Sequence, residues 1–396
     1  MRLLFYVSLV MVVYEACSMI LPLRVSWPVK LILFLPLLDG AFKNQIFQRL
    51  GGGMFFAPDL PRWLVLGGSL LYNLLVVSLV LLLCKDVLWL MWKLCPPHRL
   101  FPRVAVHISR EFPAAAASAC VLILSLVLTL WGTWEAVRVP DVKYRDAEIA
   151  GLAPEFEETK VAVLVDLHAS ALNRRPLFEA IVDRTMAEKP DLILMPGDFV
   201  DGRVQSRAHD LEPLSRLRAP LGVFASSGNH EYYSGYQSWV EQLKRFGITW
   251  LENEHRVLAR GLGQLVVAGL PDQQGGRFGH AAPDPRKALE GAPAGVPVIL
   301  LAHRPEAAKE NARAGVALQV SGHTHGGMMP GLNLLVARFN KGYVKGWYDV
   351  DGMKLFNSPG TSLWNGFPLR IFDPAEITIL VLHARPKAKS NDKEIK

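Results

Sequence analysis

The feature that most constrains the fold of this chain is the uneven distribution of its apolar residues. Nearly all the long uncharged apolar runs lie in the first third of the 396 residues, and shorter apolar runs alternate with polar segments after them. An apolar run of about 20 residues is long enough to cross a bilayer as a helix. The later residues are numerous enough to bury a globular α/β core. The sequence therefore predicts an all-α transmembrane region followed by a soluble α/β domain.

Two apolar runs have the length and the flanks of membrane-spanning helices. They cover residues 63–83 and 112–134, and Trp63 and Trp134 lie at their ends. Tryptophan is enriched where a spanning helix meets the membrane surface, because its ring is apolar and its N–H is polar. We therefore predict that both segments cross the membrane.

The sequence before these runs adds one or two further spans, so three or four are expected. Residues 3–21 are apolar apart from Glu15, and a cleaved signal peptide is the alternative interpretation of this segment. Residues 29–38 are short for a span, and they belong either to a tilted helix that begins near Trp27 or to a re-entrant piece.

The charge distribution points to a membrane protein rather than to a nucleic-acid-binding protein. The net charge is +7 and the pI is near 9.2, but no basic patch is interleaved with aromatic residues. The loop between residues 83 and 112 is the most basic, which places it in the cytoplasm by the positive-inside rule. The soluble domain is then extracytoplasmic, on an inner or plasma membrane. Basic residues outside that loop, such as Lys43 and Arg62, oppose this orientation.

Composition also suggests where the domains begin and end. The transmembrane region covers residues 1–136, a polar linker residues 137–159, the soluble domain residues 160–383 and a disordered basic tail residues 384–396. The four cysteines all precede the linker, so the soluble domain is expected to contain neither a disulfide framework nor a thiolate zinc site.

The soluble domain contains several apolar runs that are typical of buried strands and that end in polar residues. These runs are residues 161–165, 191–195, 222–225, 296–301 and 317–320. The polar residues that follow them are Asp166 and His168, then Asp198, Asn229 and His230, His303, and His323 and His325. A single Asp or an Asn-His pair after Gly can simply form a turn. Repeated delivery of polar groups to strand ends favours one common site.

The histidine pair makes a metal site the better interpretation. His323 and His325 are separated by one residue and flanked by glycines, so their imidazoles are expected to point the same way. The full set of potential ligands has seven members, all with nitrogen or oxygen donors: Asp166, His168, Asp198, Asn229, His303, His323 and His325. Seven ligands are too many for one four-coordinate zinc and fit two divalent ions that share a carboxylate. The donor types suit manganese, iron or zinc.

These motifs carry a family resemblance. The order Asp166-x-His168, Gly197-Asp198-x-x-Asp201, Gly228-Asn229-His230-Glu231, His303 and Gly322-His323-x-His325 resembles that of the calcineurin-like metallophosphoesterases. The helical region and the later Ser358-Pro359-Gly360-Thr361 motif resemble the membrane-anchored branch of that superfamily. The resemblance implies a four-layer α/β/β/α metallophosphoesterase sandwich.

The resemblance also implies a role for each residue of the site. One metal would be held by Asp166, His168 and His325, and the other by Asn229, His303 and His323, with Asp198 as the bridging catalytic carboxylate. His230 would contact the phosphate and protonate the leaving oxygen. Asp201 and Glu231 have two interpretations. Their carboxylates either orient the metal ligands or are solvated turn residues. Arg304 is either a phosphate ligand or an ordinary surface residue.

Two positions depart from the usual first motif. Val165 and Ser170 stand where relatives often have Ser and Gly. Neither side chain is expected to bind a metal, so we predict that the departure affects the shape of the loop only.

The predicted function is that of a membrane-anchored binuclear phosphoesterase, which hydrolyses phosphodiester or pyrophosphate bonds. A lipid or a nucleotide-linked glycolipid is the favoured substrate, because the anchor raises the local concentration of amphiphiles. Hydrolysis of UDP-2,3-diacylglucosamine is one such reaction, but it is cytoplasmic and contradicts the predicted orientation.

Two other functions stay open at the level of sequence. A metal-binding membrane scaffold or sensor with a vestigial hydrolase site is disfavoured by the intact set of ligands. A transporter is suggested only by Glu15 in an apolar span. The sequence does not determine the oligomeric state.

Overall fold

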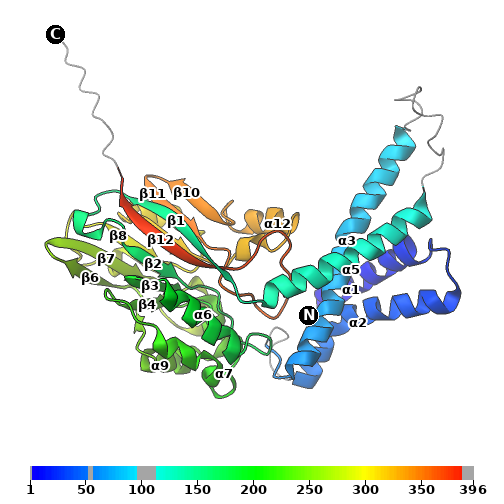
Figure 1. Ribbon diagram of the computed structural model, residues 1–396, viewed down its shortest axis with the longest axis horizontal. Helices are drawn as coiled ribbons and strands as arrows, with labels where there is room; N and C mark the ends of the chain where they lie inside the picture. The colour runs from blue at the N-terminus through cyan, green and yellow to red at the C-terminus, as the bar shows by residue number, and fades with distance from the viewer. Residues whose placement is uncertain (1, 52–56, 96–112, 386–396) are drawn as a thin grey trace, which may run out of the picture. The chain divides into compact units, whose positions relative to one another are not determined.

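A computed structural model describes residues 2–51, 57–95 and 113–385 of the chain (Figure 1). The chain divides into two compact units. We call the first, Met1–Glu135 with Asn365–Ile371, the helical unit, and the second, Ala136–Trp364 with Phe372–Lys396, the catalytic unit.

The helical unit is built from long apolar helices. They are α1 (Arg2–Glu15), which continues as a π-helical turn (Ala16–Ile20), α2 (Trp27–Gly51), α3 (Arg62–Leu94) and α5 (Ala114–Val137). Among the described residues, α3 and α5 are long and apolar enough to cross a membrane, and they contain the two runs predicted as the clearest spans. The segment near Trp27 is one helix of 25 residues. The total of three or four spans stays a prediction.

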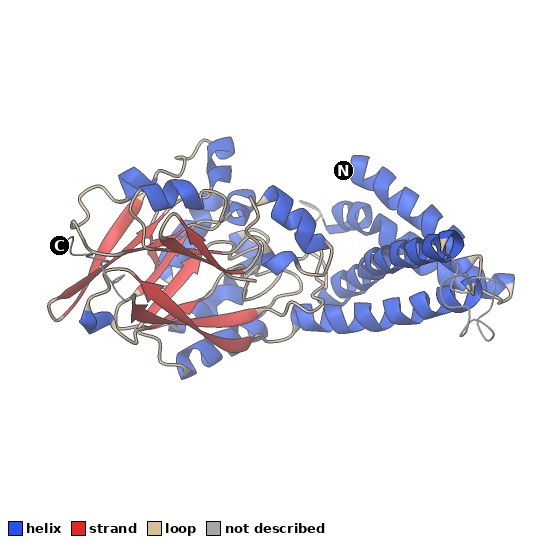
Figure 2. Cartoon of the chain, turned by 90° about the horizontal axis from the view of Figure 1, so that it is seen from above, coloured by secondary structure: helices blue, strands red, loops and turns tan. Residues whose placement is uncertain are grey.

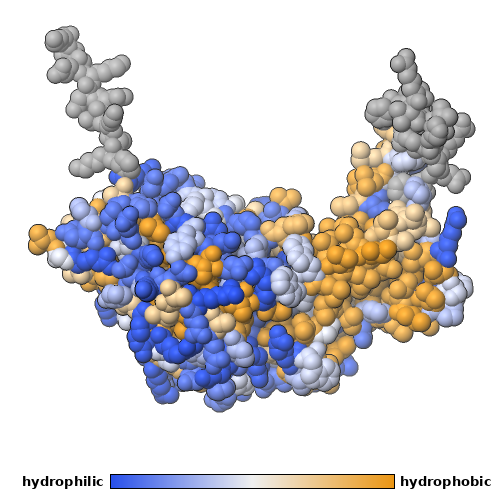
Figure 3. Space-filling view, in the orientation of Figure 1, coloured by the Kyte–Doolittle hydropathy of each residue, from blue (hydrophilic) through white to orange (hydrophobic). Residues whose placement is uncertain are grey.

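The surface of the helical unit is largely apolar (Figure 3). Large apolar side chains on α3 and α5 are exposed, among them Leu88, Ile123 and Leu130. Such a surface suits contact with lipid, because its apolar side chains would otherwise be solvated by water. The predicted basic loop after α3 continues through Arg99, Arg103 and Arg110, which lie outside the described residues.

The catalytic unit contains two six-stranded sheets (Figure 2). The first sheet has the strand order β1 (Asp141–Ile149), β12 (Glu376–Ala384), β2 (Lys160–Val163), β3 (Leu192–Pro196), β4 (Val223–Ser226) and β5 (Thr249–Trp250). The second has the order β10 (Gly346–Val350), β11 (Met353–Asn357), β9 (Leu318–Ser321), β8 (Val298–Leu301), β7 (Gly263–Gly269) and β6 (Glu254–Arg260). Both sheets are mixed, with parallel strands at their centres.

Alternation along the strands determines how the layers pack. On β3, Leu192 and Leu194 belong to a core shared by both sheets, whereas Ile193 and Met195 face the helices on the other side. Those helices are α6 (Arg175–Ala187), α7 (Val204–Leu211) and α9 (Tyr236–Arg245). A third core joins the second sheet to α10 (Pro285–Ala288) and α11 (Ala308–Arg313). The α/β class is confirmed, and the complete four-layer order stays a prediction.

The segment predicted as a linker, residues 137–159, differs in the structure. It contains β1, which pairs in parallel with β12 along its whole length, from Asp141 opposite Glu376 to Ile149 opposite Ala384. β1 is an edge strand with mostly exposed side chains, so its charged residues made it resemble a solvated connection. The start of the predicted basic tail, Ala384, is the last residue of β12, and residues 386–396 lie outside the described part of the chain.

Candidate metal centre

The predicted ligands follow the carboxyl ends of neighbouring parallel strands. β2, β3 and β4 are parallel neighbours in the first sheet, and β8 and β9 are parallel neighbours in the second. The side chains that follow them are Asp166 and His168, Asp198, Asn229, His303, and His323 and His325. Parallel strands end at the same edge of a sheet, so both sheets supply side chains to one region.

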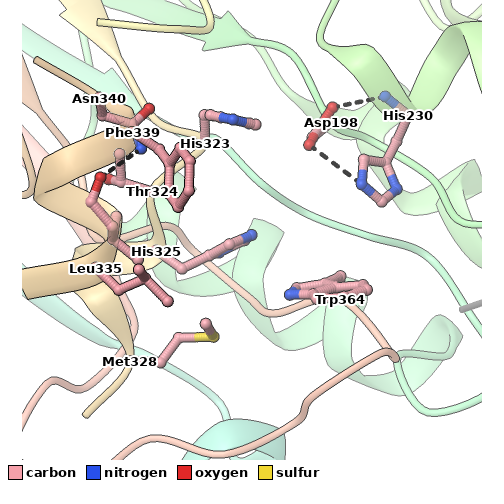
Figure 4. Close-up of a pocket in the computed structure, with 11 residues that line it drawn as sticks. Asp198, His230, His323, Thr324, His325, Met328, Leu335, Phe339, Asn340 and Trp364 are labelled. Atoms are coloured by element: carbon pink, nitrogen blue, oxygen red, sulfur yellow. Dashed lines mark hydrogen bonds and ion pairs between the residues drawn. The ribbon is translucent and has the colours of Figure 1, made fainter. Parts of the chain in front are cut away.

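Asp198 lies at the centre of this region. Its Oδ2 atom is 3.1 Å from Nε2 of His303, 3.6 Å from Nε2 of His168 and 3.9 Å from Nε2 of His230. Its Oδ1 atom accepts a hydrogen bond from the backbone N–H of His230 at 2.9 Å. Figure 4 shows Asp198 and His230 facing each other across these contacts. One carboxylate therefore borders imidazoles from three different loops.

Asp166 occupies a second position in the same cluster. Its Oδ1 atom is 4.0 Å from Nε2 of both His168 and His303, and its Oδ2 atom is 3.9 Å from Nδ1 of His325. The backbone N–H of His323 donates to the same carboxylate.

Within the described residues, three overlapping sets of side chains are close enough to share an ion. They are Asp166 with His168 and His325, His168 with Asp198 and His230, and Asp198 with His303 and His323. Six of the seven predicted ligands are in these sets. The seventh, Asn229, lies between Gly228 and His230, both of which contact Asp198.

The backbone at the site adopts a conformation that L-residues usually avoid. Five of the predicted ligands have positive φ angles: Asp166 (58°), His168 (45°), Asp198 (57°), His323 (70°) and His325 (48°). A left-handed conformation costs a non-glycine residue on the order of 1 kcal/mol, and such residues cluster at functional sites. The five predicted ligands thus share a backbone conformation that is typical of functional sites.

The ligand imidazoles are oriented by their other nitrogen atoms. Nδ1 of His303 donates to the carbonyl oxygen of Pro196 at 2.8 Å, which turns Nε2 toward Asp198. Nδ1 of His168 lies 3.2 Å from Oδ1 of Asp201, and its Nε2 also faces Asp198. Outer hydrogen bonds of this kind are typical of histidines that bind metals.

The pKa shifts of the neighbouring histidines indicate that the Asp198 carboxylate favours a positive charge beside it. Burial disfavours the imidazolium form of His303, but the carboxylates of Asp198 and Asp166 outweigh that effect and raise its pKa to about 10. The pKa of His323 is instead lowered well below its usual value, because it is buried near Arg304 and His303. The lowered pKa favours the neutral imidazole of His323, which is the form that binds a metal, and a cation beside Asp198 would take the place of the proton on His303.

A divalent cation fits this donor set. Within the described residues, His168 Nε2 and Asn229 Oδ1 are buried and form no hydrogen bond, which is costly unless another partner binds them. His168 Nε2 lies 3.6 Å from Oδ2 of Asp198, and Asn229 directly precedes His230, whose backbone N–H donates to Asp198. The available donors are nitrogen and oxygen only, so the residues suit manganese, iron or zinc.

Glu231 holds two of the ligand loops together. It is fully buried and accepts hydrogen bonds from the backbone N–H groups of Asp198 at 3.0 Å, Phe199 at 2.7 Å and Gly228 at 2.7 Å. The loops approach so closely that a Cβ on Gly228 would lie 2.2 Å from Oδ1 of Asp198. The alternative of a solvated turn carboxylate is therefore wrong for Glu231.

Asp201 is also buried, so the solvated alternative is wrong here too. Besides His168, it contacts Nδ1 of His230 at 2.5 Å. The two imidazoles and hydrogen bonds keep the pKa of Asp201 well below its usual value although burial opposes this. Asp201 therefore orients one predicted ligand and the predicted general acid together. Arg304, by contrast, pairs with Asp272 at 2.8 Å.

The Ser358–Thr361 motif braces the first ligand loop. The backbone of Val165 exchanges hydrogen bonds with Thr361 at its hydroxyl (3.2 Å) and its N–H (2.7 Å). Asn173 donates to the carbonyl oxygen of His168 at 3.0 Å, and its own N–H donates to Ser170 Oγ at 3.1 Å. Val165 and Ser170 thus take part in the shape of the loop, and no sequence motif pointed to Asn173.

A cavity of about 310 Å³ opens beside the cluster (Figure 4). One part of its lining consists of polar residues predicted from the sequence: Asp198, His230, His323 and His325. The lining also includes the apolar side chains of Met328, Leu335, Val336, Phe339 and Trp364, which were not predicted from the sequence. Most of these belong to or precede α12 (Leu332–Phe339), whose Leu-rich pattern was the available signal.

Several known proteins resemble this chain in sequence. A family described as "Calcineurin-like phosphoesterase" matches residues 159–327. A "Transmembrane protein with metallophosphoesterase domain" from Danio rerio is 30% identical and is aligned over 90% of this chain and 80% of its own length. Its counterpart from Bos taurus is 33% identical over 69% of this chain, which spans 64% of that relative's length. A metallophosphoesterase from Helicobacter pylori is 31% identical, with 67% of this chain and 70% of the relative aligned.

Proposed function

The chain belongs to the calcineurin-like phosphoesterase family and is a phosphoester hydrolase, and we propose that two divalent cations shared by Asp198 support its catalysis. Asp166, His168 and His325 would hold one ion, and Asn229, His303 and His323 the other. The observation that carries the proposal is the convergence of buried carboxylates and imidazoles on Asp198 from loops of both sheets. The native metals are manganese, iron or zinc.

The proposed chemistry is hydrolysis of a P–O bond by water. The two ions would polarise the phosphoryl group and lower the pKa of the attacking water. The water oxygen bonds to phosphorus, and the bond from phosphorus to the leaving oxygen breaks. Asp198 and the predicted ligand histidines would hold the two ions in place for this reaction, and His230 lines the cavity beside them.

His230 is the proposed general acid. Its Nδ1 is held by Asp201, while the carboxylates of Asp198 and Asp201 outweigh the effect of burial and raise its pKa to about 9. A histidine that retains its proton near neutral pH can transfer it to the leaving oxygen. Asp201 would act as a positioning residue for this imidazole.

The substrate is proposed to be a phosphodiester or pyrophosphate that is linked to a lipid or glycolipid. Helices able to cross a membrane occur in the same chain, and relatives are named transmembrane proteins. Such a protein meets amphiphilic substrates at high local concentration. Hydrolysis of the UDP-2,3-diacylglucosamine type is one example within this class.

The side of the membrane is a separate proposal, with the catalytic unit outside the cytoplasm. A tag fused after Lys396 is then cleaved by protease added to sealed cells. Protection of the tag until the cells are permeabilised would place the unit in the cytoplasm instead, where hydrolysis of a UDP-linked glycolipid belongs.

The test of the catalytic proposal uses purified full-length chain with Mn²⁺, Zn²⁺ or Mg²⁺. Simple phosphodiesters, nucleotide sugars and phospholipids are the substrates. Hydrolysis should require metal and should be lost in His325→Ala. Full hydrolysis by protein shown to be free of metal would refute the two-ion proposal.

A further inference from the structure

The cavity beside Asp198 has two chemically different walls. We call Asp198, His230, His323 and His325 its polar wall and Met328, Leu335, Phe339 and Trp364 its apolar wall, and Thr324, Val336 and Asn340 complete the lining. Trp364 lies across the opening from the α12 side chains (Figure 4), and its ring is 6.3 Å from that of His230. Figure 4 shows Met328, Leu335 and Trp364 around the same opening as His325. A substrate whose phosphate contacts the ligands would therefore have a neighbouring hydrocarbon surface.

The exposure of α12 is unusual for so apolar a helix. None of its residues is buried, and Leu334, Leu335 and Phe339 are 72%, 53% and 73% exposed. Adjacent exposed apolar side chains of this size commonly mark a binding surface, because leaving them in water forgoes the free energy of burial. Two of the three, Leu335 and Phe339, line the cavity.

The backbone couples this apolar wall to a ligand. His325, Gly326, Gly327 and Met328 have φ angles of 48°, 66°, 83° and 62°, so four consecutive residues are left-handed. The turn places His325 on the polar wall and Met328 on the apolar wall within four residues of chain. His325 and Met328 are not glycines, so their positive φ angles are energetically unfavourable. Retention of this strain favours a functional role for the wall to which each residue belongs.

We propose that the wall formed by Met328, Leu335, Phe339 and Trp364 is a subsite for a hydrocarbon chain carried by the phosphoester substrate. The inference rests on the proposed phosphoester hydrolysis at Asp198 and assigns the residues that select the substrate. The cavity volume of about 310 Å³ is at the lower end for a small-molecule site, and the partly exposed α12 side chains let a longer chain extend outward.

A second explanation for the exposed side chains is contact of α12 with a lipid surface. Leu334 separates the two explanations, because it is as exposed as Phe339 but is not among the residues that line the cavity. A lipid surface would contact Leu334 as well, whereas a subsite requires only Leu335 and Phe339. The basic neighbours Arg338 and Lys341 would favour an anionic surface in that case.

The experiment uses full-length chain in lipid nanodiscs with Mn²⁺. The substrates are p-nitrophenyl phosphodiesters whose second alcohol is methanol, butanol or hexanol, and kcat/KM is measured for each. A fully buried methylene contributes roughly fourfold, so a partly open subsite should raise kcat/KM at least roughly tenfold from methyl to hexyl. Leu335→Gln and Phe339→Gln are the test variants, and Leu334→Gln is the matched control on the same helix.

The hexyl-to-methyl ratio should fall toward one in Leu335→Gln and Phe339→Gln and stay at the wild-type value in Leu334→Gln. A ratio near one in the wild type overturns the subsite while leaving phosphoester hydrolysis intact. An unchanged ratio in both test variants also overturns it and assigns the preference to partition into the nanodisc. Equal effects of all three variants favour the lipid surface instead. If even the methyl ester is not hydrolysed, the proposed function fails, and the subsite fails with it.

Discussion

Buried polar side chains occur in both units, but they are used differently. In the helical unit, Lys43 Nζ donates to the carbonyl oxygen of Gly366 at 2.8 Å, and Asn73 Nδ2 donates to that of Pro368 at 2.8 Å. These bonds tie α2 and α3 to the segment Asn365–Ile371. These two donors therefore stabilise the chain itself, as buried polar groups in an apolar helical region commonly do.

In the catalytic unit, buried polar atoms converge without satisfying one another. His168 Nε2 and Asn229 Oδ1 form no hydrogen bond within the described residues. Single acceptors such as Asn73 Oδ1 lack a partner in the helical unit too, but there, in the part of the chain that the structure describes, no ligand atoms cluster. The difference between the two units indicates that several ligand atoms converging on a carboxylate, rather than burial of polar atoms alone, mark a site for a cation.

The largest expected effect is that of Asp198→Asn. The substitution keeps the shape of the side chain but removes the charge shared by three imidazoles. Loss of several kcal/mol of transition-state stabilisation should lower kcat/KM by about 10³-fold or more. The measurement is hydrolysis of p-nitrophenyl methyl phosphate.

Asp183→Asn is the matched control for Asp198→Asn, because Asp183 pairs with Arg216 at the surface. It should retain wild-type activity. If the two variants were equally active, Asp198 would have no special role, and the contrast between the units would disappear.

Asp201→Asn should have a smaller effect on the same reaction. The variant keeps an oxygen near His168 and His230 but lacks the carboxylate charge. Changes to groups that orient ligands typically cost about 10- to 100-fold in metal affinity or activity. Metal titration should show weaker binding, and the melting temperature of the metal-free protein should also fall, because the lowered pKa of Asp201 means that its carboxylate stabilises the folded chain. A lower melting temperature with unchanged metal affinity would indicate a purely structural role.

Removal of metal should weaken the catalytic unit selectively. A ligand present at 100 times its dissociation constant stabilises the folded state by about 2.7 kcal/mol. Chelation should therefore increase hydrogen exchange in the loops after β2, β3 and β9 and leave α2 and α3 unchanged. Readdition of Mn²⁺ should restore protection. Hydrogen exchange that increases equally in both units would show that metal binding does not stabilise the catalytic unit selectively.

The smallest effect is expected for Asn73→Leu in the helical unit. The variant loses the bonds to the Pro368 carbonyl and to Thr133 Oγ1, and hydrogen bonds between membrane helices contribute about 0.6 kcal/mol each on average. The melting temperature should fall slightly while metal content stays at the wild-type value. Loss of metal in this variant would show that the two groups of buried polar residues are not independent.

Local sequence patterns were enough to predict the strands that carry the ligands. Asp166, Asp198 and His303 each follow a short apolar run, and the run determines both the strand and the place where the side chain emerges. The pattern could not reveal β1, because its pairing with β12 joins residues more than 200 positions apart and its charged side chains are exposed. Pairing across such a distance leaves no local periodicity to read.

The apolar wall escaped prediction for a different reason. Leu335 and Phe339 fit an ordinary amphipathic helix, and only the three-dimensional structure shows that α12 leaves them unburied beside the ligands. The left-handed backbone at Asp166, Asp198 and His325 could not be predicted either. Glycine is the residue type that indicates this conformation, and none of the three is a glycine. Residue spacing predicted which side chains meet, whereas the backbone conformation at these residues is visible only in the structure.

Metal content distinguishes two cations that share Asp198 from a single ion or none. Elemental analysis of full-length chain reconstituted with Mn²⁺ should give two ions per chain in the wild type and at most one in Asp198→Ala. Fully active wild-type protein with fewer than one ion per chain, or an unchanged content in Asp198→Ala, would contradict the claim.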